Sequence, residues 1–307
     1  LLLPLGLRVH APAALLMLPL LLPASPVAAN RVRMEVLDAG QGTALLLQTG
    51  SRLLLYDSGP GSSPSRTPGN SPESEPADKA VDAAAYDLVD SVIHPAILAN
   101  GFSRPDRIVI SHGDLDHAGG LASLQQKYAS IPVFASLPEP MAGVQACTDE
   151  LNWNWQGSRF RVLHPSPYLP YKGNDSSCVL EIDVGQFKLL LPGDISSRVE
   201  KRLTGRGLDI SRILLVPHHG SRTSSTTELL HATVPELALA TAGIGNRFDF
   251  PRADVRQRYL DAGIRFLSTN RCGAISLEVA GDEAMQLRSA RRVRAAPWRW
   301  PAGAECP

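Results

Sequence analysis

A run of acidic and histidine side chains directly follows an apolar segment in this chain and limits the folds open to it. Residues 107–110 (RIVI) have the composition of a buried strand, and residues 111–120 (SHGDLDHAGG) follow at its carboxyl end. This run carries four possible metal ligands, namely His112, Asp114, Asp116 and His117. Imidazole nitrogens and carboxylate oxygens together suit zinc, manganese or iron. A polar turn with a helix-capping Asp does not require four such residues, and we therefore predict a metal site here.

Two further apolar segments end in the same way. Residues 189–194 (LLLPGD) end at Asp194, whose two oxygens can each serve one cation, so this residue can bridge a pair of ions. Residues 213–221 (ILLVPHHGS) end in two adjacent histidines. Adjacent side chains usually point apart, and we expect His218 to bind metal and His219 to face the substrate. Because three strand ends carry such residues, we predict that they meet in one site.

Apolar periodicity predicts the elements around these strand ends. Residues 31–37, 44–49 and 52–56 indicate a meander of strands, and residues 87–100 indicate a helix that Pro95 kinks or divides. The Ser-, Pro- and Gly-rich residues 59–78 predict a mobile loop. Further strands are expected at 132–135, 159–163, 178–184, 187–191, 213–216, 237–240 and 274–279, and further helices at 121–128, 197–203, 226–231 and 252–262. This order favours a layered helix/sheet/sheet/helix fold of the α/β class.

The two ends of the chain differ in composition from its middle. Residues 1–29 are almost free of charge, and the apolar part over 11–29 is long enough for a membrane segment, although residues 27–29 (VAA) also resemble a signal-peptide cleavage site. Either interpretation places the following domain outside the cytoplasm. Residues 286–307 form a basic and aromatic tail able to contact phosphates and stack on bases; a disordered tail or a membrane contact is the alternative. We expect one domain over residues 30–285.

The charge balance and the cysteine content limit the partners and the reaction classes that are open to this chain. The 30 basic and 30 acidic side chains cancel, so no global field attracts nucleic acid. The four cysteines lack the short spacings of a structural zinc site or a dithiol redox motif, and we expect Cys147 and Cys178 to be buried free thiols rather than a disulfide. The chain has no Gly-x-Ser-x-Gly motif and no reactive-cysteine setting. Hydrolysis by water activated at a pair of cations is therefore the expected reaction class.

Taken in order, five motifs resemble the metallo-β-lactamase-like domain of ComEC-type competence proteins, which are inner-membrane DNA-uptake channels. They are residues 37–42 (LDAGQG), residues 56–59 (YDSG), the run over 112–117, residues 191–194 (LPGD) and residues 216–221 (VPHHGS). The resemblance covers residues 31–280. It implies an αββα fold with two divalent ions, zinc or manganese, and no small organic cofactor. It also implies that residues 1–29 end a membrane segment, and that the hydrolase domain lies on the non-cytoplasmic face, beside the channel part of the same protein.

The same resemblance implies roles for individual residues. His112 and Asp114 would serve one ion, Asp116, His117 and His218 the other, and Asp194 would bridge them, with Asp116 and His219 acting in catalysis. Asp114 stands where most of the broader superfamily carries His. The superfamily also supplies a further His where this chain has residues 173–177 (GNDSS), and Asn174 or Asp175 would stand in for it. The remaining contacts are assigned to the substrate or to the support of the ligands: Asp38, Gln41, Asp57 and Ser221.

One departure concerns residues 246–251 (NRFDFP), because this branch often has Gly-His-Pro after the Asn-Arg-aromatic step. Loss of that His removes an auxiliary substrate or proton-transfer contact but leaves the metal ligands intact. The leading hypothesis is a phosphodiesterase that degrades the non-transported DNA strand. The alternatives are an esterase for small phosphodiesters of the phosphorylcholine type, and a catalytically weak domain that guides DNA.

Overall fold

A meander of three strands opens the described part of the computed structural model, which comprises residues 31–61, 87–185, 187–280, 284–295 and 300–307. β1 (Arg31–Val36), β2 (Leu45–Thr49) and β3 (Arg52–Tyr56) pair antiparallel in sequence order. Side chains of β1 alternate between half-buried and buried, whereas β2 is buried throughout because both of its faces are covered. The expected meander is confirmed.

The meander forms the middle of an eight-stranded sheet with the order β15-β14-β1-β2-β3-β4-β5-β6. The strands from β3 to β6 run parallel, and β14 pairs antiparallel with β1, so the last strands lie beside the first. The added strands are β4 (Arg107–Ile110), β5 (Val133–Ala135), β6 (Val144–Ala146), β14 (Ile275–Ala280) and β15 (Gln286–Ser289). β15 lies within the segment expected as a tail, so the sheet continues into that segment.

A second, seven-stranded sheet has the order β13-β12-β11-β10-β9-β8-β7. The strands from β10 to β13 are parallel, and those from β7 to β10 are antiparallel. Its members are β7 (Asn152–Trp155), β8 (Ser158–His164), β9 (Val179–Asp183), β10 (Lys188–Leu191), β11 (Ile213–Leu215), β12 (Leu237–Ala240) and β13 (Arg265–Ser268). Apolar side chains of the two sheets meet in one buried cluster between them, which includes Leu47, Phe160 and Leu239.

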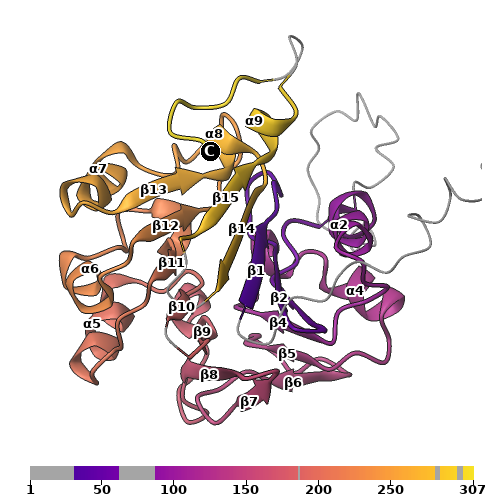
Figure 1. Cartoon of the computed structure of the whole chain (residues 1–307). Helices are drawn as coiled ribbons and strands as arrows, with labels where there is room; N and C mark the ends of the chain where they lie inside the picture. The colour runs from indigo at the N-terminus through magenta and orange to yellow at the C-terminus, as the bar shows by residue number, and fades with distance from the viewer. Residues whose placement is uncertain (1–30, 62–86, 186, 281–283, 296–299) are drawn as a thin grey trace, which may run out of the picture.

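Helices cover the outer face of each sheet, which gives four layers (Figure 1). The first sheet is covered by η1 (Val89–Ile93), α2 (His94–Ala99) and α4 (Leu121–Lys127), and the second by α5 (Ser197–Gly205), α6 (Thr227–Thr233) and α7 (Ala253–Asp261). Short helical turns complete the fold: α3 (Leu115–Ala118), η2 (Gly173–Ser176), η3 (Pro217–Gly220), α8 (Thr269–Cys272) and α9 (Ala290–Val293). The expected αββα class is confirmed, and the helix expected over 87–100 forms without a break, changing from π-helical to α-helical between Ile93 and His94, next to Pro95.

The structure contains two disulfides, and the first corrects the expectation that Cys147 and Cys178 are free thiols. Cys147 follows β6 in the first sheet and Cys178 precedes β9 in the second, and the two are bonded, with their Cα atoms 5.9 Å apart. Cys272 in α8 is bonded to Cys306. The expectation was wrong because distance along the chain does not reveal which residues of different sheets face each other.

Two segments singled out in the sequence lie mostly outside the described residues. Residues 1–29, expected as a membrane segment, and most of the Ser-rich loop expected over 59–78 lie outside the described residues. None of the helices described above combines the length and the apolar character that a bilayer crossing requires.

Candidate metal centre

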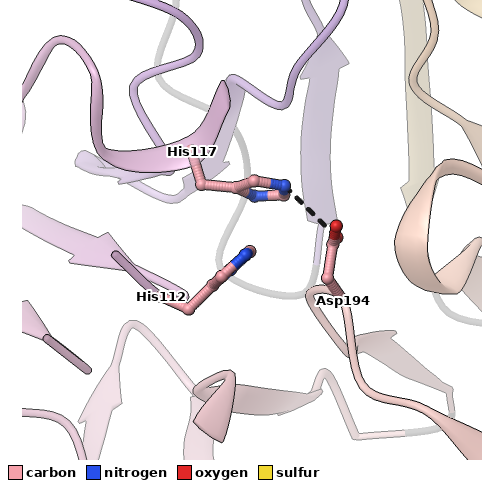
Figure 2. Close-up of side chains that lie close together, drawn as sticks. All are labelled: His112, His117 and Asp194. Atoms are coloured by element: carbon pink, nitrogen blue, oxygen red, sulfur yellow. Dashed lines mark ion pairs between the residues drawn. The ribbon is translucent and has the colours of Figure 1, made fainter. Parts of the chain in front are cut away.

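The site forms where strands of both sheets end. β4 of the first sheet ends at Ile110, and the chain then passes His112 and enters α3, which carries Asp116 and His117. β10 of the second sheet leads to Asp194, and β11 leads to the histidines of η3. Figure 2 shows His112, His117 and Asp194 pointing toward one another from these separate segments. Neither sheet alone supplies the whole cluster.

Nitrogen and oxygen atoms of these side chains gather within bonding range of a shared cation. His117 Nε2 lies 3.2 Å from Asp194 Oδ1, and His219 Nε2 lies 3.3 Å from Asp116 Oδ2 and 3.5 Å from Asp194 Oδ2. Two groups each place their ligand atoms within 4.8 Å of one another, one of His112, His117 and Asp194 and one of Asp116, His117 and His219. The two groups share His117, so they are adjacent.

The ligand atoms fit a divalent cation. His112 Nε2 is buried and has no hydrogen-bond partner, although a buried polar atom is normally satisfied. His117 Nε2 and His219 Nε2 face each other at 3.1 Å across the same space. Nitrogen donors with carboxylate oxygens, and no thiolate, are a donor set that zinc or manganese accepts. A cation between these atoms would satisfy the orphaned nitrogen.

A second set of hydrogen bonds orients the imidazole rings. Asp57, fully buried, accepts a hydrogen bond from His117 Nδ1 at 2.8 Å and from the Ser111 backbone N–H at 2.6 Å. His219 Nδ1 lies 2.9 Å from the carbonyl oxygen of Thr241 and donates to it. With Nδ1 acting as the donor in both rings, Nε2 keeps its lone pair for a cation. Sequence reasoning missed Ser111 and Thr241, whose residue types carry no metal-site pattern.

The charges in the cluster strongly shift the pKa values of its side chains. Burial opposes a charge on His117, but the carboxylates of Asp194 and Asp57 outweigh it and hold the pKa of His117 well above its ordinary value. Burial likewise opposes ionisation of Asp194, yet His117 and His219 hold the pKa of Asp194 well below its usual range. Burial lowers the pKa of His218. A proton and a cation therefore compete for Nε2 of His117.

The two adjacent histidines occupy different environments. Both have left-handed backbone angles, with φ of 50° at His218 and 55° at His219, a conformation that ordinary residues adopt mainly at functional or tightly constrained sites. His219 is 2% exposed and belongs to a ligand group. His218 lies at the rim, 3.8 Å from Asp194 and 3.3 Å from Asn174 Nδ2. We expected His218 on the metal and His219 toward the substrate; the structure brings both next to Asp194, with His219 deeper.

Asp114, Asn174 and Asp175 lie at different distances from the ligand groups. The exposed Asp114 approaches His112 Nε2 at 3.6 Å but belongs to neither ligand group. Of the two candidates for the missing superfamily His, Asn174 contacts His218. The carboxylate of Asp175 instead accepts a hydrogen bond from the Ser196 N–H and pairs with Arg198. Asp175 is therefore engaged away from the cluster.

Three residues expected near the substrate line the surrounding loops. Asp38 pairs with Arg291 at 3.2 Å. Gln41 Oε1 accepts a hydrogen bond from the Gly243 N–H, while its buried Nε2 has no partner. Ser221 Oγ lies 3.1 Å from Thr223 Oγ1, whose own contact is His218 Nδ1 at 3.0 Å. The Ser221 side chain thus reaches the His218 ring through Thr223, while its backbone N–H donates to the His218 carbonyl at 2.8 Å.

Glycine and aromatic residues shape the site. Gly193, with φ of +59°, precedes Asp194, and a Cβ there would come within 2.7 Å of Ser177 Cβ, so the turn that aims Asp194 requires glycine. The Tyr171 hydroxyl accepts the Gly113 N–H beside Asp114. Phe250, at the position of the missing His, packs against His219 and His218 at centroid distances of 6.2 and 5.7 Å. Sequence reasoning had not singled out Tyr171 or the ring of Phe250.

Comparison with known proteins places this geometry in a family. The model of the metallo-beta-lactamase superfamily matches residues 37–240. The chain is 34% identical to Competence protein ComA of Neisseria gonorrhoeae over 94% of this chain and 38% of that protein. It is 28% identical to ComE operon protein 3 of Bacillus subtilis over 81% of this chain and 33% of that protein, so it spans well under half of either relative.

A solved structure agrees at the level of the fold. The metallo-beta-lactamase fold protein YhfI of Bacillus subtilis matches with a TM-score of 0.50 at 12% identity, over 81% of this chain and 99% of that chain. At this identity the likeness indicates a shared fold alone.

Proposed function

The chain belongs to the metallo-β-lactamase superfamily, and from this we propose that it is a metal-dependent phosphodiesterase that hydrolyses DNA. The observation that carries the proposal is the pair of ligand groups that share His117 and draw on both sheets. Two adjacent cations, zinc or manganese, would lower the pKa of a bound water and stabilise charge on an attacked phosphoryl group. Hydrolysis then needs no nucleophile from the protein.

The chain's own residues prepare the site for this chemistry. Asp57 and Thr241 each hold an imidazole by Nδ1, which keeps two Nε2 atoms aimed into one space. Asp194 stands between the histidines of both sheets, the place from which one carboxylate can serve two ions. Asp116, half-buried beside His219, lies between the buried ligands and solvent. These contacts fix the ligands before substrate arrives, and preorganisation of this kind is what accelerates reactions.

DNA is proposed as the substrate on two grounds. A relative over 94% of the chain is named a competence protein. The described C-terminal segment also carries arginines on β15 and α9, and Arg291 there reaches Asp38 on a loop beside the site. We further propose that the domain belongs to a longer inner-membrane protein, lies on its non-cytoplasmic face beside a channel part, and degrades the strand that is not transported.

Labelled oligonucleotides test the proposal directly. Purified protein is incubated with single- and double-stranded DNA in Mn²⁺ or Zn²⁺, and the metal content is measured on the same sample. We expect the unaltered protein to cleave DNA. Asp194→Asn should abolish this cleavage and Asp175→Asn should leave it unchanged, because of these two residues only Asp194 belongs to a ligand group. Metal-loaded protein that cleaves no DNA would contradict the nuclease assignment.

The same samples separate the alternative functions. Hydrolysis of bis-nitrophenyl phosphate or a phosphorylcholine ester without DNA cleavage would instead indicate a small-phosphodiester esterase. Normal DNA uptake by cells with a folded Asp116→Ala/His117→Ala variant would indicate a DNA-guiding role.

A further inference from the structure

Three rings form a continuous stack that leads from the metal centre to the surface. The Phe250 ring lies 6.2 Å from the His219 ring with an interplanar angle of 21°, and the Phe248 ring lies 5.3 Å from Phe250 at 19°. His219 belongs to a ligand group, whereas Phe248 is 37% exposed. A planar group placed on Phe248 would thus extend a stack that begins at a cation-binding imidazole.

Packing of the core does not account for this stack. Neither Phe248 nor Phe250 belongs to any of the three buried apolar clusters of the described residues. The segment that carries them instead leads from the end of β12, through Thr241, to the start of α7, and borders the site. Aromatic side chains at the rim of a polar centre are placed where they can contact a ligand.

A guanidinium group lies over each of the two phenylalanine rings, so an incoming base would stack on Phe248 or on the Arg247 guanidinium over it. Arg247 Cζ lies 4.7 Å from the centroid of Phe248, and Arg252 Cζ lies 5.9 Å from that of Phe250. Arg252 is paired with Asp249 at 3.3 Å, but Arg247 has no carboxylate partner among the residues that the structure describes. Its charge is therefore available to an anion next to the ring.

We propose that Phe248, Phe250 and Arg247 form a stacking platform for an unpaired nucleobase of single-stranded nucleic acid. An aromatic face accepts any base, and a guanidinium beside it can stack as well or contact the neighbouring phosphate. Bases within a duplex are already stacked on both faces, so the platform favours an unpaired strand. The inference rests on the proposed function, because that function places a phosphodiester at the adjacent metal centre.

Binding measured without cleavage tests the platform. Fluorescence anisotropy follows a labelled mixed-sequence single strand in EDTA, which keeps the strand intact, and circular dichroism reports the fold of each variant. We expect Phe248→Ala to weaken binding at least about fivefold and Phe248→Trp to preserve it, because stacking on an aromatic side chain contributes on that order per base. Ile210→Ala, which removes a 67% exposed apolar side chain ahead of β11, serves as the matched control and should bind normally.

A strand with abasic sites isolates the base contact. On that strand the Phe248→Ala variant and the unaltered protein should bind equally, since no base remains to stack. Arg247→Gln should reduce the slope of log affinity against log salt by about 0.7, the share of one phosphate contact in single-stranded nucleic acid. Equal binding of the natural strand by Phe248→Ala and the unaltered protein, or an equal loss on the abasic strand, would overturn the platform.

The platform and the proposed nuclease can fail separately. DNA cleavage together with binding that does not depend on Phe248 removes the platform alone. Phe248-dependent binding in EDTA, by a protein that cleaves no phosphodiester once it is loaded with metal, removes the proposed function alone.

Discussion

Residues around the cluster orient its histidines by binding the ring nitrogen, Nδ1, that faces away from the cluster. Asp57 and Thr241 occupy the Nδ1 atoms of His117 and His219, which leaves the Nε2 atoms directed at the shared space. The run over 112–117 and Asp194 could be found from sequence, because possible ligands directly after a buried strand form a recognisable pattern. The depths of His218 and His219 could not, because they depend on two consecutive left-handed residues that no local pattern predicts.

Asp57→Asn should weaken metal binding about 10- to 100-fold, because the amide loses the charge that orients His117 and raises the basicity of its ring. Competition with a chromophoric chelator measures the affinity. Asp175→Asn, which alters a carboxylate engaged with Arg198, is the matched control and should bind metal normally. Unchanged affinity in Asp57→Asn would show that the contact only supports packing.

Metal affinity should rise with pH through the neutral range. In the metal-free protein the carboxylates of Asp194 and Asp57 outweigh burial and raise the pKa of His117, so a proton must leave before a cation binds. Asp194, whose pKa is lowered, stays ionised and adds no pH dependence there. We expect a gain of up to about tenfold per pH unit and the release of about one proton, measured by titration calorimetry in two buffers. Affinity independent of pH from 6 to 8 would contradict this.

Among the secondary-structure elements, the central strands and the covering helices could be predicted from runs of apolar residues. The short strands at the sheet edges could not. Sequence reasoning overlooked β7 and β15, because they are short edge strands with mostly exposed or half-buried side chains and so lack a buried run. It also overlooked α3, which is a single turn inside the ligand run and is recognisable only by the way it returns His117 to the cluster. β13, with three buried residues out of four, was also missed.

The buried Glu200 anchors the segment between η3 and α6. Its carboxylate accepts the backbone N–H groups of Ser225 at 2.6 Å and Thr226 at 2.8 Å. Glu200→Ala would leave both donors without an acceptor and should lower the free energy of unfolding by about 3 kcal/mol, measured by urea denaturation. Glu228→Ala, at an exposed position on α6, should cost less than about 1 kcal/mol. Equal effects of the two substitutions would refute the anchoring role.

In the molecule as a whole, the C-terminal strands pair with the N-terminal ones. β14 pairs with β1, β15 adds on the outer side of β14, and the Cys272–Cys306 disulfide ties the C-terminal end to α8. The αββα architecture could be predicted from the order of strands and helices, but the inclusion of β15 in the sheet and both disulfides depend on contacts between distant segments. Such pairings leave no local trace in composition or periodicity.

Replacing both Cys272 and Cys306 by serine should lower the free energy of unfolding by about 3 kcal/mol, because the disulfide closes a long loop in the unfolded chain. Urea denaturation under non-reducing conditions provides the comparison. The metal stoichiometry should not change, because neither cysteine belongs to a ligand group. An unaltered denaturation midpoint would mean that this link adds nothing to stability.

The division of the ligands between the two sheets has a consequence for biosynthesis. His112, Asp116 and His117 emerge from the ribosome with the early strands of the first sheet, whereas Asp194 and His219 follow with strands of the second. A nascent chain therefore cannot complete either ligand group until both halves have been made and have docked. A cation at this site would thus bind late in maturation, and a truncated product that stops before Asp194 would lack at least one member of each ligand group.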